Sequence, residues 1–192
     1  MMTALFFGPL SMRAAVLLLT LVLAACATVP PASDRVLVAP GVTLALPAPG
    51  ELGRREDAVQ LVTARRDGET FVFECRLSVD GERLLLAGSD SMGRRAMTVT
   101  WSRDGIVVER ADWLPETLKP ENVLADIVLL YWPEEAVRRG LSGAPLIQTP
   151  QGRSVGDSIV VSWRGDPWNG LSRLVNRPWG YEIEVRSARV AP

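Results

Sequence analysis

The sequence predicts a mainly β protein with a helical insertion, and three observations carry this prediction. Strand patterns separated by turn residues repeat from Val59 to Glu109, two helical segments follow near 120–141, and strand patterns resume from Pro145 to Val190. Because consecutive strands are joined by short connections, they are expected to form antiparallel meanders. A chain of 192 residues has the length of a single domain and can bury a core without disulfide bonds.

The first group of strands shows period-two alternation of apolar and polar residues. Phe71, Phe73 and Cys75 fall on one face, as the pleat of a strand requires. Asp80-Gly81 is expected to form a two-residue hairpin turn in which glycine supplies a positive φ. The nine expected strands, with five before the helices and four after them, are 59–65, 70–79, 82–88, 95–101, 106–109, 145–148, 158–163, 171–176 and 181–190.

Two helices are expected between the groups of strands. Pro120 opens the first at a position that tolerates proline, and Glu134-Glu135 and Arg138-Arg139-Gly140 give the second an acidic start and a basic end followed by glycine. The residues from 123 to 132 are apolar on almost every side of the first helix. Such a helix must be covered on both sides.

The N-terminal region has the features of a secretory signal. Arg13 precedes twelve uncharged residues, which are too few to cross a bilayer core. The run ends in 23–26, Leu-Ala-Ala-Cys, which resembles a bacterial lipobox and implies lipidation at Cys26. An ordinary signal peptide followed by an accidental cysteine is the alternative, and Met1 and Met12 are both possible starts.

The expected organisation is therefore a lipoprotein signal peptide over 1–25, a lipidated cysteine with a proline-rich tether over 26–57, and a folded domain over 58–192. Proline fixes φ and removes a hydrogen-bond donor, so a proline-rich segment is typically extended and semi-rigid. Within the tether, the apolar runs 36–38 and 42–46 could still add a short edge strand.

The composition favours binding over catalysis. A net charge of −1 argues against nucleic acid, and the absence of histidine removes the Ser/His and Cys/His nucleophiles and the histidine metal sites. No metal or cofactor is expected. Lys119 is the single lysine, and Cys75 lies on an apolar strand face, where an inert core thiol is expected. An enzyme is the weakest hypothesis because it would need Cys75 to be reactive.

Several motifs, taken in order, carry a resemblance to a known family. The strand–loop–strand segment 83–95 and the segment 133–143 resemble parts of the LolA/LolB-type carriers and outer-membrane receptors of lipoproteins. The segments 63–65, 71–74, 92–95, 124–126, 132–133 and 176–181, in this order, more closely resemble an uncharacterised proteobacterial lipoprotein family, the domain of unknown function 3261.

The resemblance implies a half-open antiparallel β-barrel with the two helices near 120–141 as a lid over an apolar cavity. A cavity for acyl chains needs an apolar lining from alternate strand positions. The alternative is that the same side chains simply fill a dry core. The candidate cavity residues are Phe71, Phe73, Leu85, Met97, Val99, Trp101, Ile127 and Trp132.

Three residues are candidates for contact with a membrane or partner. Met92 occupies the loop from which LolB-type receptors extend an apolar residue, although Ser89, Asp90 and Ser91 make this loop more polar than the family pattern. Trp168 is expected at a hairpin tip, where it either reaches an interface or folds back onto the sheet. Arg177 could meet a lipid phosphate or form a cation–π contact with the nearby Trp179.

The function implied is that of a periplasm-facing lipoprotein of the outer membrane that binds or accepts a hydrophobic ligand. Ala27 follows the lipobox cysteine, and by resemblance to sorted lipoproteins a residue other than aspartate there favours the outer membrane. The expected partners are the membrane through the lipid anchor, a lipid-like or lipoprotein cargo, and a periplasmic carrier protein. The resemblance to this family suggests a role in the transport of envelope lipids, including aryl-polyene lipids. The alternative is a non-catalytic adaptor of an envelope assembly.

Overall fold

A computed structural model describes residues 35–190 and contains one ten-stranded antiparallel sheet, one three-stranded sheet and two α-helices. The mainly β class with a helical insertion is confirmed. The strands of the large sheet are β3 (Glu56–Arg66), β4 (Glu69–Val79), β5 (Arg83–Asp90), β6 (Arg95–Ser102), β7 (Gly105–Arg110), β9 (Leu146–Thr149), β10 (Gly152–Val155), β11 (Ile159–Asp166), β12 (Asn169–Asn176) and β13 (Tyr181–Arg189).

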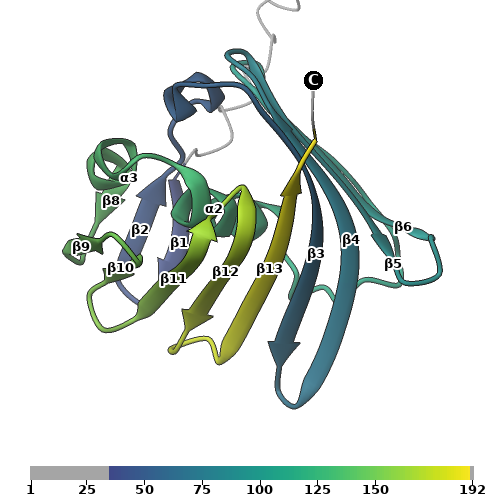
Figure 1. The fold of residues 1–192 in the computed structure, drawn as a ribbon. Helices are drawn as coiled ribbons and strands as arrows, with labels where there is room; N and C mark the ends of the chain where they lie inside the picture. The colour runs from purple at the N-terminus through teal and green to yellow at the C-terminus, as the bar shows by residue number, and fades with distance from the viewer. Residues whose placement is uncertain (1–34, 191–192) are drawn as a thin grey trace, which may run out of the picture. The chain divides into compact units, whose positions relative to one another are not determined.

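The large sheet consists of two five-stranded meanders joined at its centre (Figure 1). Strands β3 to β7 form one meander in chain order and β9 to β13 form the other, and β3 pairs with β13 from Ala58↔Arg189 to Arg66↔Tyr181. Within residues 35–190 the end strands β7 and β9 do not pair with each other, so the sheet is not closed. The open, curved arrangement is compatible with a half-open β fold.

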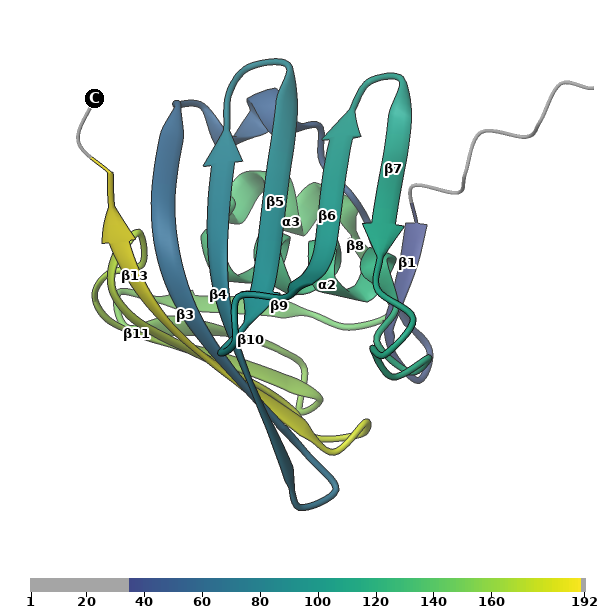
Figure 2. The ribbon, with the colours of Figure 1, turned by 90° about the vertical axis from the view of Figure 1, so that its right-hand side faces the viewer.

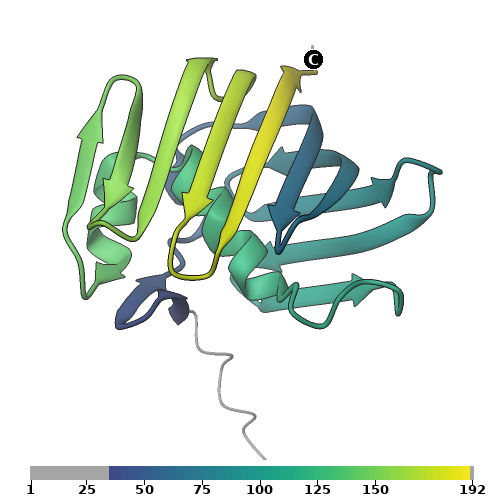
Figure 3. The same ribbon diagram turned by 90° about the horizontal axis from the view of Figure 1, so that it is seen from below.

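The helices α2 (Pro120–Tyr131) and α3 (Glu134–Gly140) connect the two meanders. The sheet curves around α2, as the view from below shows (Figure 3). Every residue from Leu124 to Tyr131 is buried, including those on opposite sides of the helix. The expectation that α2 is covered on both sides is therefore confirmed.

Part of the predicted tether is folded. Residues 35–57 contain β1 (Arg35–Ala39), β2 (Val42–Ala45), the 3-10 helix η1 (Pro49–Leu52) and the start of β3. Strands β1 and β2 pair with each other, and β2 also pairs with β8 (Leu141–Ser142). The prolines lie between these elements or at their first residue, so they mark breaks between short strands instead of a continuous extended segment. Residues 26–34 lie outside the described residues.

The predicted two-residue turn at Asp80-Gly81 is wrong. The last paired residues of the two strands are Val79 and Leu84, with the four residues 80–83 between them, and Gly81 does not have a positive φ. The turn is instead closed by the Asp80 carboxylate, whose Oδ1 accepts hydrogen bonds from the backbone N–H groups of Glu82 and Arg83, both at 2.9 Å. Aspartate commonly stabilises a turn in this way.

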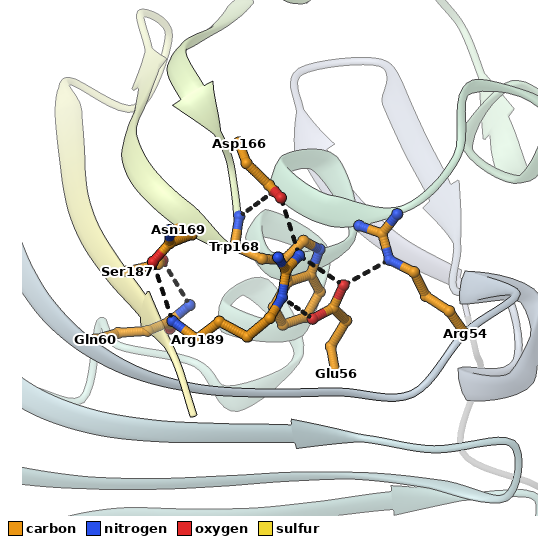
Figure 4. Close-up of polar contacts among 8 residues, drawn as sticks. All are labelled: Arg54, Glu56, Gln60, Asp166, Trp168, Asn169, Ser187 and Arg189. Carbon is orange, nitrogen blue, oxygen red and sulfur yellow. Dashed lines mark hydrogen bonds and ion pairs between the residues drawn. The ribbon is translucent and has the colours of Figure 1, made fainter. Parts of the chain in front are cut away.

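A charged network joins one end of the central strand pair, where β3 begins and β13 ends, to the β11–β12 hairpin (Figure 4). The buried Glu56 carboxylate accepts two hydrogen bonds from Arg189, at 2.7 and 3.0 Å, and is 2.7 Å from Nε of Arg54. Arg189 also bonds Asp166, whose Oδ1 accepts a hydrogen bond from the backbone N–H of Trp168. This network fixes the hairpin tip against β3 and β13.

Strands β3 to β7 lie side by side with α2 behind them (Figure 2). The inward positions of β5 and β6 are apolar, with Leu84, Leu86, Met97, Val99 and Trp101 all buried.

Within residues 35–190 no helix has the length and apolar character needed to cross a membrane.

Candidate ligand cavity

A cavity of about 910 Å³ lies between the concave face of the large sheet and α2. This volume is within the range of small-molecule sites in proteins, which is roughly 300–1,000 Å³. The wall is formed by inward residues of β3 to β7 and β13, by one side of α2 along its length, by the start of β1, and by residues 114–119 that precede α2. Most of these side chains are apolar, so the cavity suits an apolar ligand.

Four of the eight predicted cavity residues lie in the wall. Phe71 and Phe73 point inward from β4, Met97 from β6 and Ile127 from α2. Phe71 and Phe73 are only half-buried because the cavity lies in front of them. The period-two pattern of β4 therefore placed the right face towards the cavity.

The other four predicted residues lie outside the wall. Val99, Trp101 and Trp132 are buried in the packed core, where the rings of Trp101 and Trp132 stack with centroids 5.9 Å apart. The dry-core alternative is thus correct for these three. Leu85 is 37% exposed and lies on the outer face, because its neighbours Leu84 and Leu86 occupy the inner face of β5.

A buried carboxyl group interrupts the apolar wall. Asp126 of α2 is 7% exposed, and the Tyr181 hydroxyl lies 2.9 and 3.0 Å from its two oxygens. Burial raises the pKa of Asp126 to about 7, and the hydrogen bond from Tyr181 opposes this rise. The Tyr181 oxygen in turn accepts a hydrogen bond from Nδ2 of Asn176, which also donates to the Val38 carbonyl. This chain of bonds connects α2 to β13, β12 and β1.

A second polar group ties the other end of α2 to the sheet. Nε2 of Gln60 donates to the Tyr131 hydroxyl at 2.9 Å and to Oγ of Ser187 at 3.2 Å, and all three residues are buried. Burial raises the pKa of Tyr131 to about 12, so the phenol stays protonated. Together, the Asp126 and Tyr131 groups hold α2 in place across the cavity.

Cys75 lies in the cavity wall, with its side chain half-buried. Burial raises the pKa of its thiol to about 12. Because the nucleophile is the thiolate, this environment disfavours reactivity. Within residues 35–190 no cluster of acidic or cysteine side chains has the arrangement of a metal site.

The three predicted contact residues have different environments. Met92 is 72% exposed at the β5–β6 loop, as the contact hypothesis requires. Trp168 is fully buried and packs on Tyr131 with ring centroids 4.5 Å apart, so it cannot contact a membrane or partner. Arg177 is exposed, and its Nη1 donates to the Asp157 carbonyl at 2.8 Å, while Trp179 stacks on Tyr181 instead. Cys26 lies outside the described residues.

Several wall residues were not anticipated from the sequence. Gln60, Val62 and Ala64 come from β3, and Tyr181, Ile183 and Val185 come from β13. Their period-two spacing was a usable signal for an inward face. Local sequence patterns do not predict that these two strands, which are more than 100 residues apart, pair at the centre of the sheet.

Residues 57–189 match the family described as "Protein of unknown function (DUF3261)". The chain belongs to this uncharacterised family. The matched region covers β3 to β13 almost completely and therefore includes the large sheet, both helices and most of the cavity wall. No curated protein matches the chain.

Proposed function

We propose that this member of the DUF3261 family binds or accepts a hydrophobic, lipid-like ligand in the cavity beneath α2. The observation that carries the proposal is an apolar, half-open cavity of about 910 Å³ that the side chains of the domain do not fill. Interiors normally close-pack, so an apolar space of this size requires an explanation.

The N-terminal sequence supports a place for this binding at the cell envelope. Because segment 23–26 resembles a lipobox, Cys26 is the proposed site of lipidation. In this proposal the lipid anchors the protein to the outer membrane, and the domain faces the periplasm. Diacylation and amine acylation would together give stable membrane anchoring. In this proposal the ligand is a lipid or the acyl chains of a lipoprotein, delivered by a periplasmic carrier as in LolA/LolB-type systems, and aryl-polyene lipids are among the candidates.

Filling the cavity is expected to abolish ligand uptake. Ala64 lines the wall beside Phe71, its partner across β3 and β4, so Ala64→Trp would place an indole ring in the ligand's space. We expect at least a tenfold loss of affinity for a fluorescent fatty-acid probe, since 1.4 kcal/mol of lost contact corresponds to a factor of about ten. Fluorescence titration of the purified protein measures this affinity.

Ala87→Trp is the matched control, because Ala87 is exposed on the outer face of β5. The control should bind the probe like the unaltered protein. Circular dichroism of both variants confirms that they remain folded. Equal affinities for the two variants would place the bound probe elsewhere and contradict the proposal.

A second candidate function, a non-catalytic adaptor in an envelope assembly, is favoured by exposed apolar side chains outside the cavity. Met92 is 72% exposed and Ile147 is 58% exposed. Exposed apolar side chains mark a docking surface where they belong to a contiguous patch. In this case photocrosslinkers at positions 92 and 147 would capture the same specific protein from Ala64→Trp as from the unaltered protein, because an adaptor needs no ligand in the cavity.

A further inference from the structure

The mouth of the cavity carries a local excess of positive charge. Four basic residues line the cavity and are exposed, and we call them the rim cations: Arg35, Arg65, Arg66 and Lys119. Glu121 is the one exposed acidic residue in the described wall. Since the whole chain has a net charge of −1, this excess belongs to the rim and is not a property of the entire surface.

Two of the rim cations, Arg65 and Arg66, form ion pairs with the protein that are long and exposed to solvent. Arg65 lies 3.3 Å from Glu182, but the two oxygens of Glu182 are already bound by Arg173 at 2.6 and 2.8 Å. Arg66 lies 3.3 Å from its exposed neighbour Asp67. Among residues 35–190, no carboxylate forms an ion pair with Lys119. Exposed pairs such as these contribute little to stability, so an incoming anion can replace them at small cost.

The interior of the cavity is unsuited to an anion. The rim cations are the only basic residues in the described wall. The groups further inside are apolar side chains, the phenols of Tyr131 and Tyr181, the Cys75 thiol, the Asp126 carboxyl and the Gln60 amide, whose Nε2 already donates to Tyr131 and Ser187. A buried anion without a partner is strongly unfavourable. An amphiphile with a negative head must therefore lie with its head at the rim and its apolar chain inside.

We propose, on the basis of the proposed function, that the natural ligand is an amphiphile whose anionic head is a carboxylate or a phosphate. The head is bound at the rim by Arg65, Arg66 and Lys119, and the apolar chain lies in the cavity. The guanidinium groups match the geometry of carboxylate and phosphate oxygens, and Lys119 adds a point charge. Arg35 adds positive charge on the β1 side while donating to Oγ1 of Thr43.

The test compares three ligands that share one oleoyl chain and differ in the head. Oleate carries a carboxylate, oleoyl lysophosphatidic acid a phosphate, and monooleoylglycerol neutral hydroxyl groups. In displacement of a fluorescent probe below the critical micelle concentrations, we expect at least one anionic ligand to bind about tenfold more tightly than the neutral one, and the two anions to distinguish a carboxylate site from a phosphate site. Raising the ionic strength should reduce this preference, because the rim is exposed to solvent.

Arg66→Glu/Lys119→Glu should remove the anion preference while leaving the affinity for monooleoylglycerol unchanged. The matched control is Arg95→Glu/Arg103→Glu, which makes the same change in charge at exposed arginines outside the cavity; Arg103 pairs with its neighbour Asp104 much as Arg66 pairs with Asp67. The control should keep the preference.

Equal binding of the three ligands, with no dependence on salt, would overturn this inference while leaving the proposed function intact. Failure of all three ligands to bind would overturn both. Binding of acetate or inorganic phosphate as tightly as the oleoyl ligands would also overturn the inference, because the apolar chain would then contribute nothing. The ligand series and the salt dependence use the unaltered protein, so they decide the question even if the double variant does not fold.

Discussion

Replacing Trp132 by alanine is expected to lower the free energy of unfolding by about 3–5 kcal/mol. Trp132 follows the last residue of α2 and is fully buried, with its ring stacked on Trp101 of β6. Its Nε1 donates to the Ala48 carbonyl, and its own carbonyl accepts a hydrogen bond from Arg153 of β10. The substitution would leave a large cavity where α2, η1 and both meanders meet.

Urea unfolding followed by far-ultraviolet circular dichroism measures this loss. Trp113→Ala is the control, because Trp113 is 41% exposed beneath the guanidinium group of Arg94 and should cost about 1 kcal/mol or less. A loss below about 1 kcal/mol for Trp132→Ala would mean that this junction is not packed as described.

The protein is expected to lose stability as the pH rises from about 4 to about 7, and Asp126→Asn should remove this dependence. The pKa of Asp126 is raised to about 7 in the folded protein, while an unfolded aspartate titrates near 3.9. Below pH 4 the carboxyl is protonated in both states. Between these values the folded state keeps a proton that the unfolded chain releases, so stability falls by up to about 1.4 kcal/mol per pH unit and levels off above pH 7.

Urea midpoints at pH 5 and pH 8 test this prediction, with Asp104→Asn as a control in an exposed turn. The difference in stability between Asp126→Asn and the unaltered protein should shift in favour of the variant between pH 5 and pH 8, because only the unaltered protein loses stability over this range. Asp104→Asn should lose stability with pH as the unaltered protein does. If Asp126→Asn showed the same pH dependence as the unaltered protein, the carboxyl would be ionised throughout, and the buried Asp126–Tyr181 pair would need another description.

Much of the fold followed from local sequence patterns. Both helices and the nine expected strands are present, because period-two alternation and turn residues are local signals. Strands β8 and β10 were not predicted. Strand β8 has only two residues, and β10 has the sequence Gly-Arg-Ser-Val, in which neither apolar alternation nor strand propensity is evident. Residues 35–57 were predicted as tether because the five prolines of 26–57 outweighed the apolar runs 36–38 and 42–46, for which only a short edge strand was allowed.

The cavity was predicted only in part, and the reason is three-dimensional. Alternation along β4 identified Phe71 and Phe73 correctly, but the same rule, applied one residue out of phase on β5, selected Leu85 on the outer face. Inward direction alone does not separate a cavity wall from a packed core, since Val99 and Trp101 also point inward. That distinction depends on where α2 crosses the sheet. Tyr181 and Gln60 lie together in the site because β3 pairs with β13, and no local sequence pattern predicts a pairing between strands so far apart in the chain.

Native mass spectrometry of the protein purified gently from a bacterial envelope tests the central claim most directly. The account predicts a bound species of lipid mass that is retained by the unaltered protein and by Ala87→Trp and absent from folded Ala64→Trp. Its fragmentation would also show whether it carries a carboxylate or a phosphate. A protein that remains free of adduct, both as purified and after incubation with envelope lipids, would contradict ligand binding in the cavity.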